Sequence, residues 1–277
     1  MNNDRHATPP GMLPSALRVF DISLGEMLWS RRTIFMALVV GLPVVLAMIV
    51  RTLDLAHGLR VNSAAVNGPA IFGLIIWGLF IRFIVPVLGV FYGTALIADE
   101  VEDKTITYLF TRPIPRGAVL MGKYLAYLAC TVFVVLPSVM LVWLLIIPIG
   151  GSLGGNFIDV VKDLGLIAIG LAVYGAVFAL VGAALKRPLL IGLLWAFGLE
   201  PALLLIPGYL KHLTVAYYLQ GLVPQAMPSD SPASLVMAIF REIPTLSESL
   251  IALTIMEVGF LWLASRVVAG REYVLEQ

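Results

Sequence analysis

Residues 99–123 carry the densest group of charged side chains in this chain, and they lie between two long apolar stretches. The segment reads DEVEDK at 99–104 and RPIPR at 112–116, and Lys123 follows, so acids come first and bases second. Eight of its residues are charged, in a chain with only 18 Lys and Arg and 17 Asp and Glu. The segment is too long for a simple turn. We expect it to lie in water and to offer a soluble partner a specific surface.

The acids of this segment are a weak candidate for a metal site. Carboxylate oxygens of Asp99, Glu100, Glu102 and Asp103 are ligands that a hard cation prefers. However, no glycine turns the chain as a calcium loop requires, and Lys104 follows the acids directly. The chain's three histidines are far apart and have no metal-ligand spacing. We therefore predict no metal site and an acidic face that is solvated or meets a partner.

Two short motifs resemble enzymatic ones and are rejected on context. Gly117 to Lys123 fits the start of a phosphate-binding loop, G-x-x-x-x-G-K, but Tyr124 replaces the Ser or Thr that contacts magnesium, and no strand precedes it. Gly150 to Gly154 matches the G-x-S-x-G elbow of serine hydrolases around Ser152. That elbow needs a strand before it and a helix after it, whereas a Gly-rich connection is simply flexible.

Three charged residues fall within apolar stretches: Arg82, Glu200 and Glu257. A charge in hydrocarbon is unfavourable by about 2.5 to 3.5 kcal/mol, so such residues face a bundle interior or a wet cavity. We expect Arg82 to pair with Glu200 or Glu257, either as part of a substrate pathway or gate or as a structural ion pair. Gly89 and Gly93 form a G-x-x-x-G step that predicts close helix packing.

The composition places the chain in a membrane. Hydrophobic residues make up 60% of it and charged residues 13%, whereas soluble domains have an apolar share of about 45 to 50%. A net charge of +1 argues against nucleic acid, which binds clustered positive charge. The single cysteine, Cys130, falls in an apolar run and is expected to be a packing residue. The first apolar run begins only at Thr33, unlike a signal peptide.

Six apolar stretches predict six transmembrane helices in an all-α membrane protein, since about 20 apolar residues cross a core of about 30 Å. They lie near 33–50, 70–97, 121–147, 164–185, 188–207 and 249–268. With six spans, both termini and residues 98–120 share one side, which carries 12 Lys and Arg against 5 on the other. Positive residues are retained inside, so we expect these parts to be cytoplasmic.

The remaining segments flank this bundle. Leu17, Phe20, Leu24, Met27 and Leu28 recur at helical spacing and predict a helix in the membrane interface; the alternative is an extension of the first span. Residues 208–248 hold short apolar pieces among prolines and predict re-entrant or interfacial helices. We divide a single domain, 1–277, into a cytoplasmic tail with interfacial helix (1–32), the six-span bundle with its coupling segment 98–120 (33–268), and a cytoplasmic tail (269–277).

The segment from Ile97 to Tyr124 resembles the signature of permease subunits of type-2 ATP-binding-cassette (ABC) transporters. In that family an acidic residue ends the second span, a Gly-Thr or Lys-Thr step and a Leu-rich turn follow, and a Pro-x-x-Arg corner and a Gly-Lys open the third span. Here those positions read DEVEDKT at 99–105, LFTRPIPR at 109–116 and Gly122-Lys123. Lys104 is a departure, since glycine is common there. The predicted layout of spans is also similar.

The resemblance implies a multi-pass permease of a bacterial or archaeal cell (inner) membrane that exports its substrate. It would form a homodimer or heterodimer with a second permease subunit and work with separate cytoplasmic ABC ATPase subunits, which would bind ATP and magnesium; this chain would need no cofactor and catalyse nothing itself. The connection after the second span would be a coupling helix docked on the ATPase. Its residues would be Glu100, Glu102, Asp103, Lys104 and Thr105 at the start, and Arg112, Pro113 and Arg116 at the end.

Other classes stay open from the sequence. An ATP-independent secondary transporter or channel would carry inverted repeats and broken spans, and no repeat is evident, although Pro86 and Pro137 are each able to interrupt a span. A membrane hydrolase would require a reactive Ser152. An inert assembly or anchoring subunit would use the same fold. The transported substrate cannot be read from the residues.

Overall fold

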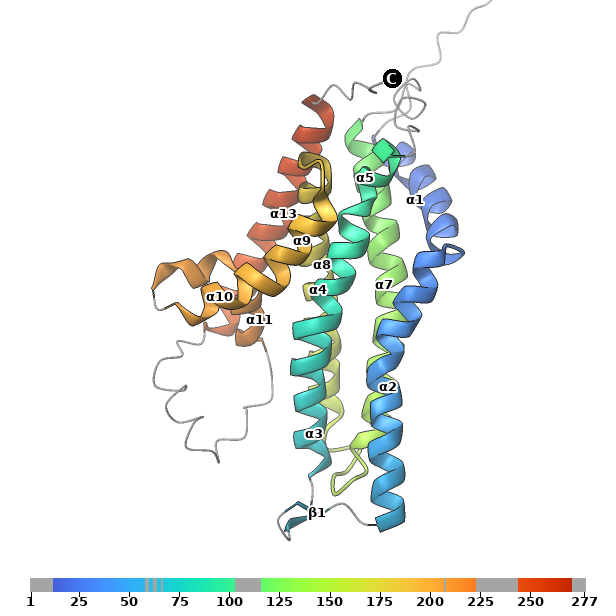
Figure 1. Ribbon diagram of the computed structural model, residues 1–277, viewed down its shortest axis with the longest axis vertical. Helices are drawn as coiled ribbons and strands as arrows, with labels where there is room; N and C mark the ends of the chain where they lie inside the picture. Colours follow the sequence, from blue (N-terminus) through green and yellow to red (C-terminus); the bar gives the residue numbers. More distant parts are fainter. Residues whose placement is uncertain are drawn as a thin grey trace, which may run out of the picture.

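The computed structural model describes residues 12–57, 60–61, 64–65, 67–102, 116–206, 208–222 and 244–270, and these form a bundle of long helices (Figure 1). Two strands of two residues each, β1 (Arg60–Val61) and β2 (Ala64–Ala65), pair as an antiparallel hairpin at one end. Among these described residues, five helices are long and apolar enough to cross a membrane. The predicted helical architecture is therefore confirmed, apart from this small hairpin.

The first long helix, α2 (Arg31–His57), follows α1 (Met12–Leu28) after a break at residues 29–30. The break is stabilised by the hydroxyls of Ser30 and Thr33, which both donate to the carbonyl oxygen of Met27. The helix predicted before the first span is thus present; its fully buried residues are small, including Ser15 and Ala16, while Leu24 and Met27 of the predicted apolar set pack partly against the core. The helix packs along α7, and Leu17, predicted on the apolar face, is 58% exposed.

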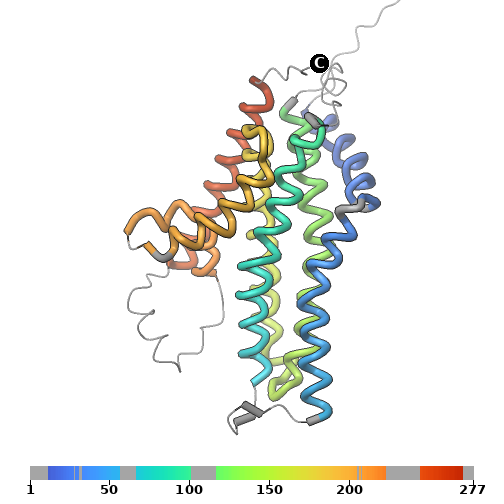
Figure 2. The backbone as a smooth tube through the Cα atoms, viewed as in Figure 1, coloured from blue at the N-terminus to red at the C-terminus, as the bar shows by residue number. Residues whose placement is uncertain are grey.

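The second long helix is one continuous rod (Figure 2), and its winding changes along its length. It comprises α3 (Gly68–Ile75), the π-helical η1 (Ile76–Ile84), α4 (Val85–Leu88), the π-helical η2 (Gly89–Gly93) and α5 (Ala95–Glu102). Pro86 explains the interruption, because it has no N–H to donate and its ring clashes with the preceding turn of an α-helix. Wider π turns on both sides relieve that clash.

Helices α7 (Arg116–Ile146) and α8 (Phe157–Ala184) form the centre of the bundle. Helix α8 packs against α7, η2 and the last helix, α13 (Leu246–Gly270), and most of its residues are buried. Between α7 and α8, Gly150 has a φ of 75°, a conformation that glycine adopts without strain. The rod from α3 to α5 corresponds to the predicted second span, and α7, α8 and α13 correspond to the third, fourth and sixth.

The predicted fifth span corresponds to an apolar helix that is shorter than the five long helices of the described residues. It runs as α9 (Pro188–Leu194), the π-helical η3 (Trp195–Leu199) and α10 (Glu200–Leu205). Gly208, with a φ of 128°, then turns the chain into the 3-10 helix η4 (Tyr209–Leu213) and into α11 (Val215–Gly221). Figure 1 shows α10 and α11 projecting to one side of the bundle. Short helices thus precede the last span, as predicted, while residues 223–243 lie outside the described chain.

The described ends of the chain lie at the same end of the bundle. The start of α1, the ends of α5 and α13, and the turn between α8 and α9 are all at the top of Figure 1, opposite the β1–β2 hairpin. The predicted number of six crossings stays a prediction, because only five helices among the described residues are long and apolar enough to cross a membrane. The side of the membrane on which this end lies stays a prediction from the Lys and Arg distribution.

Candidate functional site

A salt bridge closes the base of the charged segment that the sequence singles out. The carboxylate of Glu100, in α5, accepts a hydrogen bond from the ammonium group of Lys123, in α7. The Lys123 side chain is 11% exposed and the Glu100 side chain 19%. Because both charges are largely removed from water, the pair fixes where α5 ends relative to α7 and therefore holds the two ends of 103–115 together.

The other coupling residues are divided between the helix ends and the undescribed segment. Glu102 is the last residue of α5, and Arg116 is the first residue of α7. Asp103, Lys104, Thr105, Arg112 and Pro113 lie outside the described residues. Glu100 and Glu102 thus belong to the helical extension of the second span.

Glu200, at the start of α10, is the centre of a buried hydrogen-bond network. Its side chain is 1% exposed, and Oε2 accepts a hydrogen bond of 2.8 Å from the hydroxyl of Tyr174 in α8. Its Oε1 accepts one of 2.9 Å from the backbone N–H of Ala216 in α11. One carboxylate therefore connects α8, α10 and α11, and it satisfies an N–H in the first turn of α11 that has no partner within that helix.

Arg82 lies beside this network, in the π-helical η1. Its guanidinium carbon is 5.0 Å from the ring centroid of Trp77, and its charge acts on both Glu200 and Tyr174. The combination of a cation, an aromatic face and a nearby carboxylate is a standard way of holding Arg in an apolar bundle. Of the two acids considered from the sequence, Glu200 is the one on which the charge of Arg82 acts, and a direct ion pair between them stays a prediction.

Glu257, in the middle of α13, belongs to a second polar contact. Its Oε1 is 2.9 Å from the hydroxyl of Tyr124, which is also 2.9 Å from the carbonyl oxygen of Ala172. The neighbouring Tyr127 donates a hydrogen bond of 2.8 Å to the carbonyl oxygen of Leu171. Two tyrosines of α7 thus contact backbone carbonyls of α8, and Tyr124 also reaches α13.

The G-x-x-x-G step lies where η2 crosses α8. A Cβ placed on Gly89 would be 2.8 Å from the Cβ of Tyr174, and one on Gly93 would be 2.9 Å from the Cβ of Phe178. Both distances are shorter than van der Waals contact, so only glycine allows this approach. The contact brings η2 against the turn of α8 that carries Tyr174, the hydrogen-bond partner of Glu200.

The sequence did not identify Lys123 as the partner of Glu100, nor the three buried tyrosines Tyr124, Tyr127 and Tyr174 as bundle contacts. A signal was present, because Tyr124 and Tyr127 are three residues apart on one helix face. Their partners are backbone carbonyls and acids far away in sequence, which periodicity does not reveal.

The structure also bears on the rejected motifs. The stretch Gly117 to Lys123 lies within α7 and is helix rather than a phosphate-binding loop. Ser152 accepts a hydrogen bond of 3.2 Å from the N–H of Gly155 and lies in a turn without strands. Within the described chain, no group of three His, Cys, Asp or Glu residues is placed to hold a metal ion.

The five long apolar helices of the described residues are those of a multi-pass α-helical membrane protein. The sequence comparison identifies its family: residues 32–267 match the model of the ABC-2 family transporter proteins, and the chain belongs to that family. The match covers the whole described bundle from α2 nearly to the end of α13. The resemblance drawn from residues 97–124 is thereby confirmed. No curated protein matches the chain.

Proposed function

We propose that this chain is the membrane-spanning subunit of an ATP-driven ABC exporter, that it forms the substrate pathway as a dimer, and that separate cytoplasmic ATPase subunits drive it. The observation that carries the proposal is the membership in the ABC-2 transporter family together with the Glu100–Lys123 salt bridge. Family membership supports an ATPase partner and no catalysis by this chain itself. The salt bridge joins the two helices that flank residues 103–115, the segment proposed to dock on the ATPase.

The mechanical argument starts from the two helices that flank the segment. The second long helix ends in α5, before the segment, and α7 begins after it; both are long and pack against α8. A force applied to residues 103–115 would be carried by both helices at once, because the Glu100–Lys123 pair prevents them from separating. Rigid-body motion of packed helices is a common way of transmitting a switch. In this proposal, closure of the ATPase tilts α5 and α7 as a unit.

The substrate pathway is proposed to be lined by the first, second and fifth spans at the dimer interface. Two of these, the second and the fifth, contain π-helical stretches, η1, η2 and η3. Such stretches occur often at functional sites. The Arg82–Glu200 interaction joins η1 to the helix after η3, so in the proposed gate a movement of one span is felt by the other.

The test uses Glu100→Ala and Arg116→Ala in the full chain expressed with its native operon. We expect both variants to reach the membrane but to retain little ATPase in copurification and little ATP-driven transport. Wild-type levels of both would place coupling elsewhere. The rival, an ATP-independent transporter or channel, predicts transport in vesicles that contain the purified chain alone, and such transport would overturn the proposal.

A further inference from the structure

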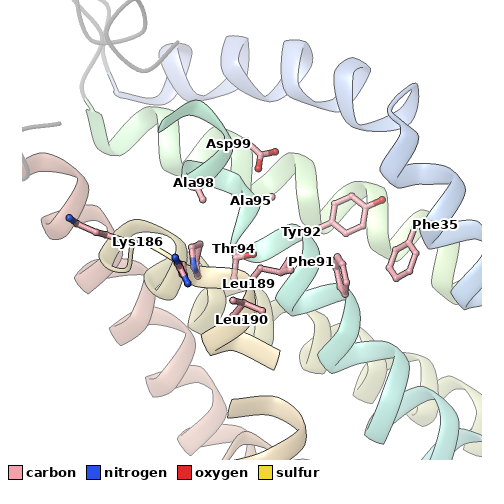
Figure 3. Close-up of a pocket in the computed structure, with 12 residues that line it drawn as sticks. Phe35, Phe91, Tyr92, Thr94, Ala95, Ala98, Asp99, Lys186, Leu189 and Leu190 are labelled. Atoms are coloured by element: carbon pink, nitrogen blue, oxygen red, sulfur yellow. The ribbon is translucent and has the colours of Figure 1, made fainter. Parts of the chain in front are cut away.

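A cavity of about 550 Å³ opens between the end of the second long helix and the turn that joins α8 to α9 (Figure 3). It is separate from the Glu200 network, and it lies near the end of the bundle that carries the described termini. Figure 3 shows Lys186 on one side of it and the rings of Phe35 and Tyr92 on the other. The cavity is therefore amphipathic, with a cationic side and an aromatic side.

The apolar side is built from three helices. Phe35 of α2 packs against Phe91 of η2, with ring centroids 4.7 Å apart, and Leu189 and Leu190 of α9 complete the wall. Phe35 is 38% exposed and Leu190 61% exposed. The exposed apolar surface continues along α9 through Ile191 and Leu194. A long hydrocarbon chain lying on this surface would bury apolar area that a single copy of the chain leaves uncovered.

The cationic side is fixed by the turn between α8 and α9. Helix α8 ends at Ala184, and the next residue, Leu185, is extended. Pro188 keeps Arg187 out of the helical conformation. Lys186 and Arg187 therefore lie in a short exposed turn. Neither residue forms a salt bridge within the described residues. Asp99 also borders the cavity, and this carboxylate already has an interaction of its own. The lining therefore carries an excess of positive charge.

We propose that this cavity binds an anionic phospholipid, with its phosphate at Lys186 and Arg187 and an acyl chain along Phe35, Phe91 and Leu190. A phosphate joined to a long hydrocarbon is the chemistry that meets both sides, and Lys and Arg at a membrane boundary attract anionic head groups. The ammonium group of Lys186 and the guanidinium group of Arg187 can reach the lipid head-group layer while the aliphatic parts of both side chains cover apolar surface. The orientation under Proposed function makes this the inner leaflet; the binding itself does not depend on an ATPase.

The test is native mass spectrometry of the purified full chain, without an ATPase, in detergent titrated with phosphatidylglycerol or phosphatidylcholine. We expect phosphatidylglycerol to bind the wild type more tightly. The double variant Lys186→Gln, Arg187→Gln should weaken that binding about thirtyfold, from the typical contribution of two basic residues near an anionic lipid surface. The exchange Lys186→Arg, Arg187→Lys keeps both charges and should preserve binding within about twofold.

Controls separate this site from general charge and from free phosphate. The double variant Arg51→Gln, Lys162→Gln removes two basic residues at the opposite end of the bundle, each of which pairs with a nearby acid, and it should leave phosphatidylglycerol binding unchanged. Glycerol 3-phosphate, a head group without acyl chains, should not displace the lipid. Equal loss in the control, no loss at Lys186 and Arg187, or displacement by glycerol 3-phosphate would each overturn the proposal.

Discussion

The carboxylate of Glu100 and the ammonium of Lys123, 23 residues apart in sequence, form a salt bridge across the base of segment 103–115. The ion pairs Arg51–Asp54 and Lys162–Asp159 differ from it in range, because each joins residues three apart on one helix. The Glu100–Lys123 pair alone among these joins two long helices. A long-range pair of this kind fixes helix register and gives a connecting segment a stable base.

Breaking this pair is expected to destabilise the bundle. Removing one partner of a largely buried ion pair leaves an uncompensated charge, which costs about 3 to 5 kcal/mol when burial is complete and less at the 11% and 19% exposure seen here. We expect Glu100→Gln and Lys123→Met each to lower the midpoint of thermal unfolding in detergent by several degrees. The exchange Glu100→Lys, Lys123→Glu should restore part of the loss.

The matched control for this prediction is the exposed pair of Lys162 and Asp159, whose side chains are 56% and 39% exposed. Exposed pairs contribute about 0 to 1 kcal/mol, so Lys162→Gln should leave the midpoint almost unchanged. A Glu100 variant as stable as the Lys162 variant would contradict the role given to the pair.

A second prediction concerns which acid interacts with Arg82. In a double-mutant cycle, Arg82→Gln and Glu200→Gln should be non-additive by at least about 0.5 kcal/mol in unfolding free energy, because the two charges interact. Arg82→Gln and Glu257→Gln should be additive. A coupling that is larger for Glu257 than for Glu200 would reverse the assignment.

The hydroxyl of Tyr174 provides a third prediction. Tyr174→Phe removes the hydrogen bond of 2.8 Å to Glu200 while keeping the ring in place. Hydrogen bonds to charged groups contribute about 1.5 to 3 kcal/mol, so the variant should be clearly less stable in thermal unfolding. Tyr209→Phe is the control, since Tyr209 is 91% exposed. Equal stability of the two variants would show that the Tyr174–Glu200 contact contributes little.

Close packing at the G-x-x-x-G step is tested by single alanine substitutions on one helix. A Cβ at Gly93 would lie 2.9 Å from the Cβ of Phe178, whereas one at Gly78 would meet nothing within 4 Å. Gly93→Ala should therefore be destabilising by about 1 to 3 kcal/mol through overpacking. Gly78→Ala should be neutral or slightly stabilising, since Ala favours helices over Gly. Thermal unfolding of the two variants side by side decides this; a neutral Gly93→Ala would refute the packing argument.

Much of the fold could be predicted because long apolar stretches in a bilayer have almost no alternative to helix. The spans near 121–147 and 249–268 correspond to α7 and α13 on this ground alone. The π-helical stretches could not be predicted in the same way. They depend on how Pro86 and the helix after Pro188 pack against α8, and apolar periodicity carries no information on that packing.

The site was predictable in part for a similar reason. Arg82, Glu200 and Glu257 stand out because charge is rare in apolar stretches, but their partners are chosen by the tertiary arrangement. The assignment of Arg82 to Glu200 required knowing that η1 lies near the start of α10. The interfacial placement of α1 stays a prediction, and its contact with α7 through small residues such as Ala16 could not be predicted, because apolar periodicity marks only the large side chains.

The most direct test of the central proposal is site-specific photo-crosslinking in cells. A photoreactive amino acid is placed at Leu109, within the proposed coupling segment, and in parallel at Ser152, in the connection at the opposite end of the bundle. The account predicts a covalent adduct with a cytoplasmic ABC ATPase from position 109, absent when Glu100→Ala is also present, and no such adduct from position 152. An ATPase adduct from position 152, or none from position 109 in active membranes, would contradict it.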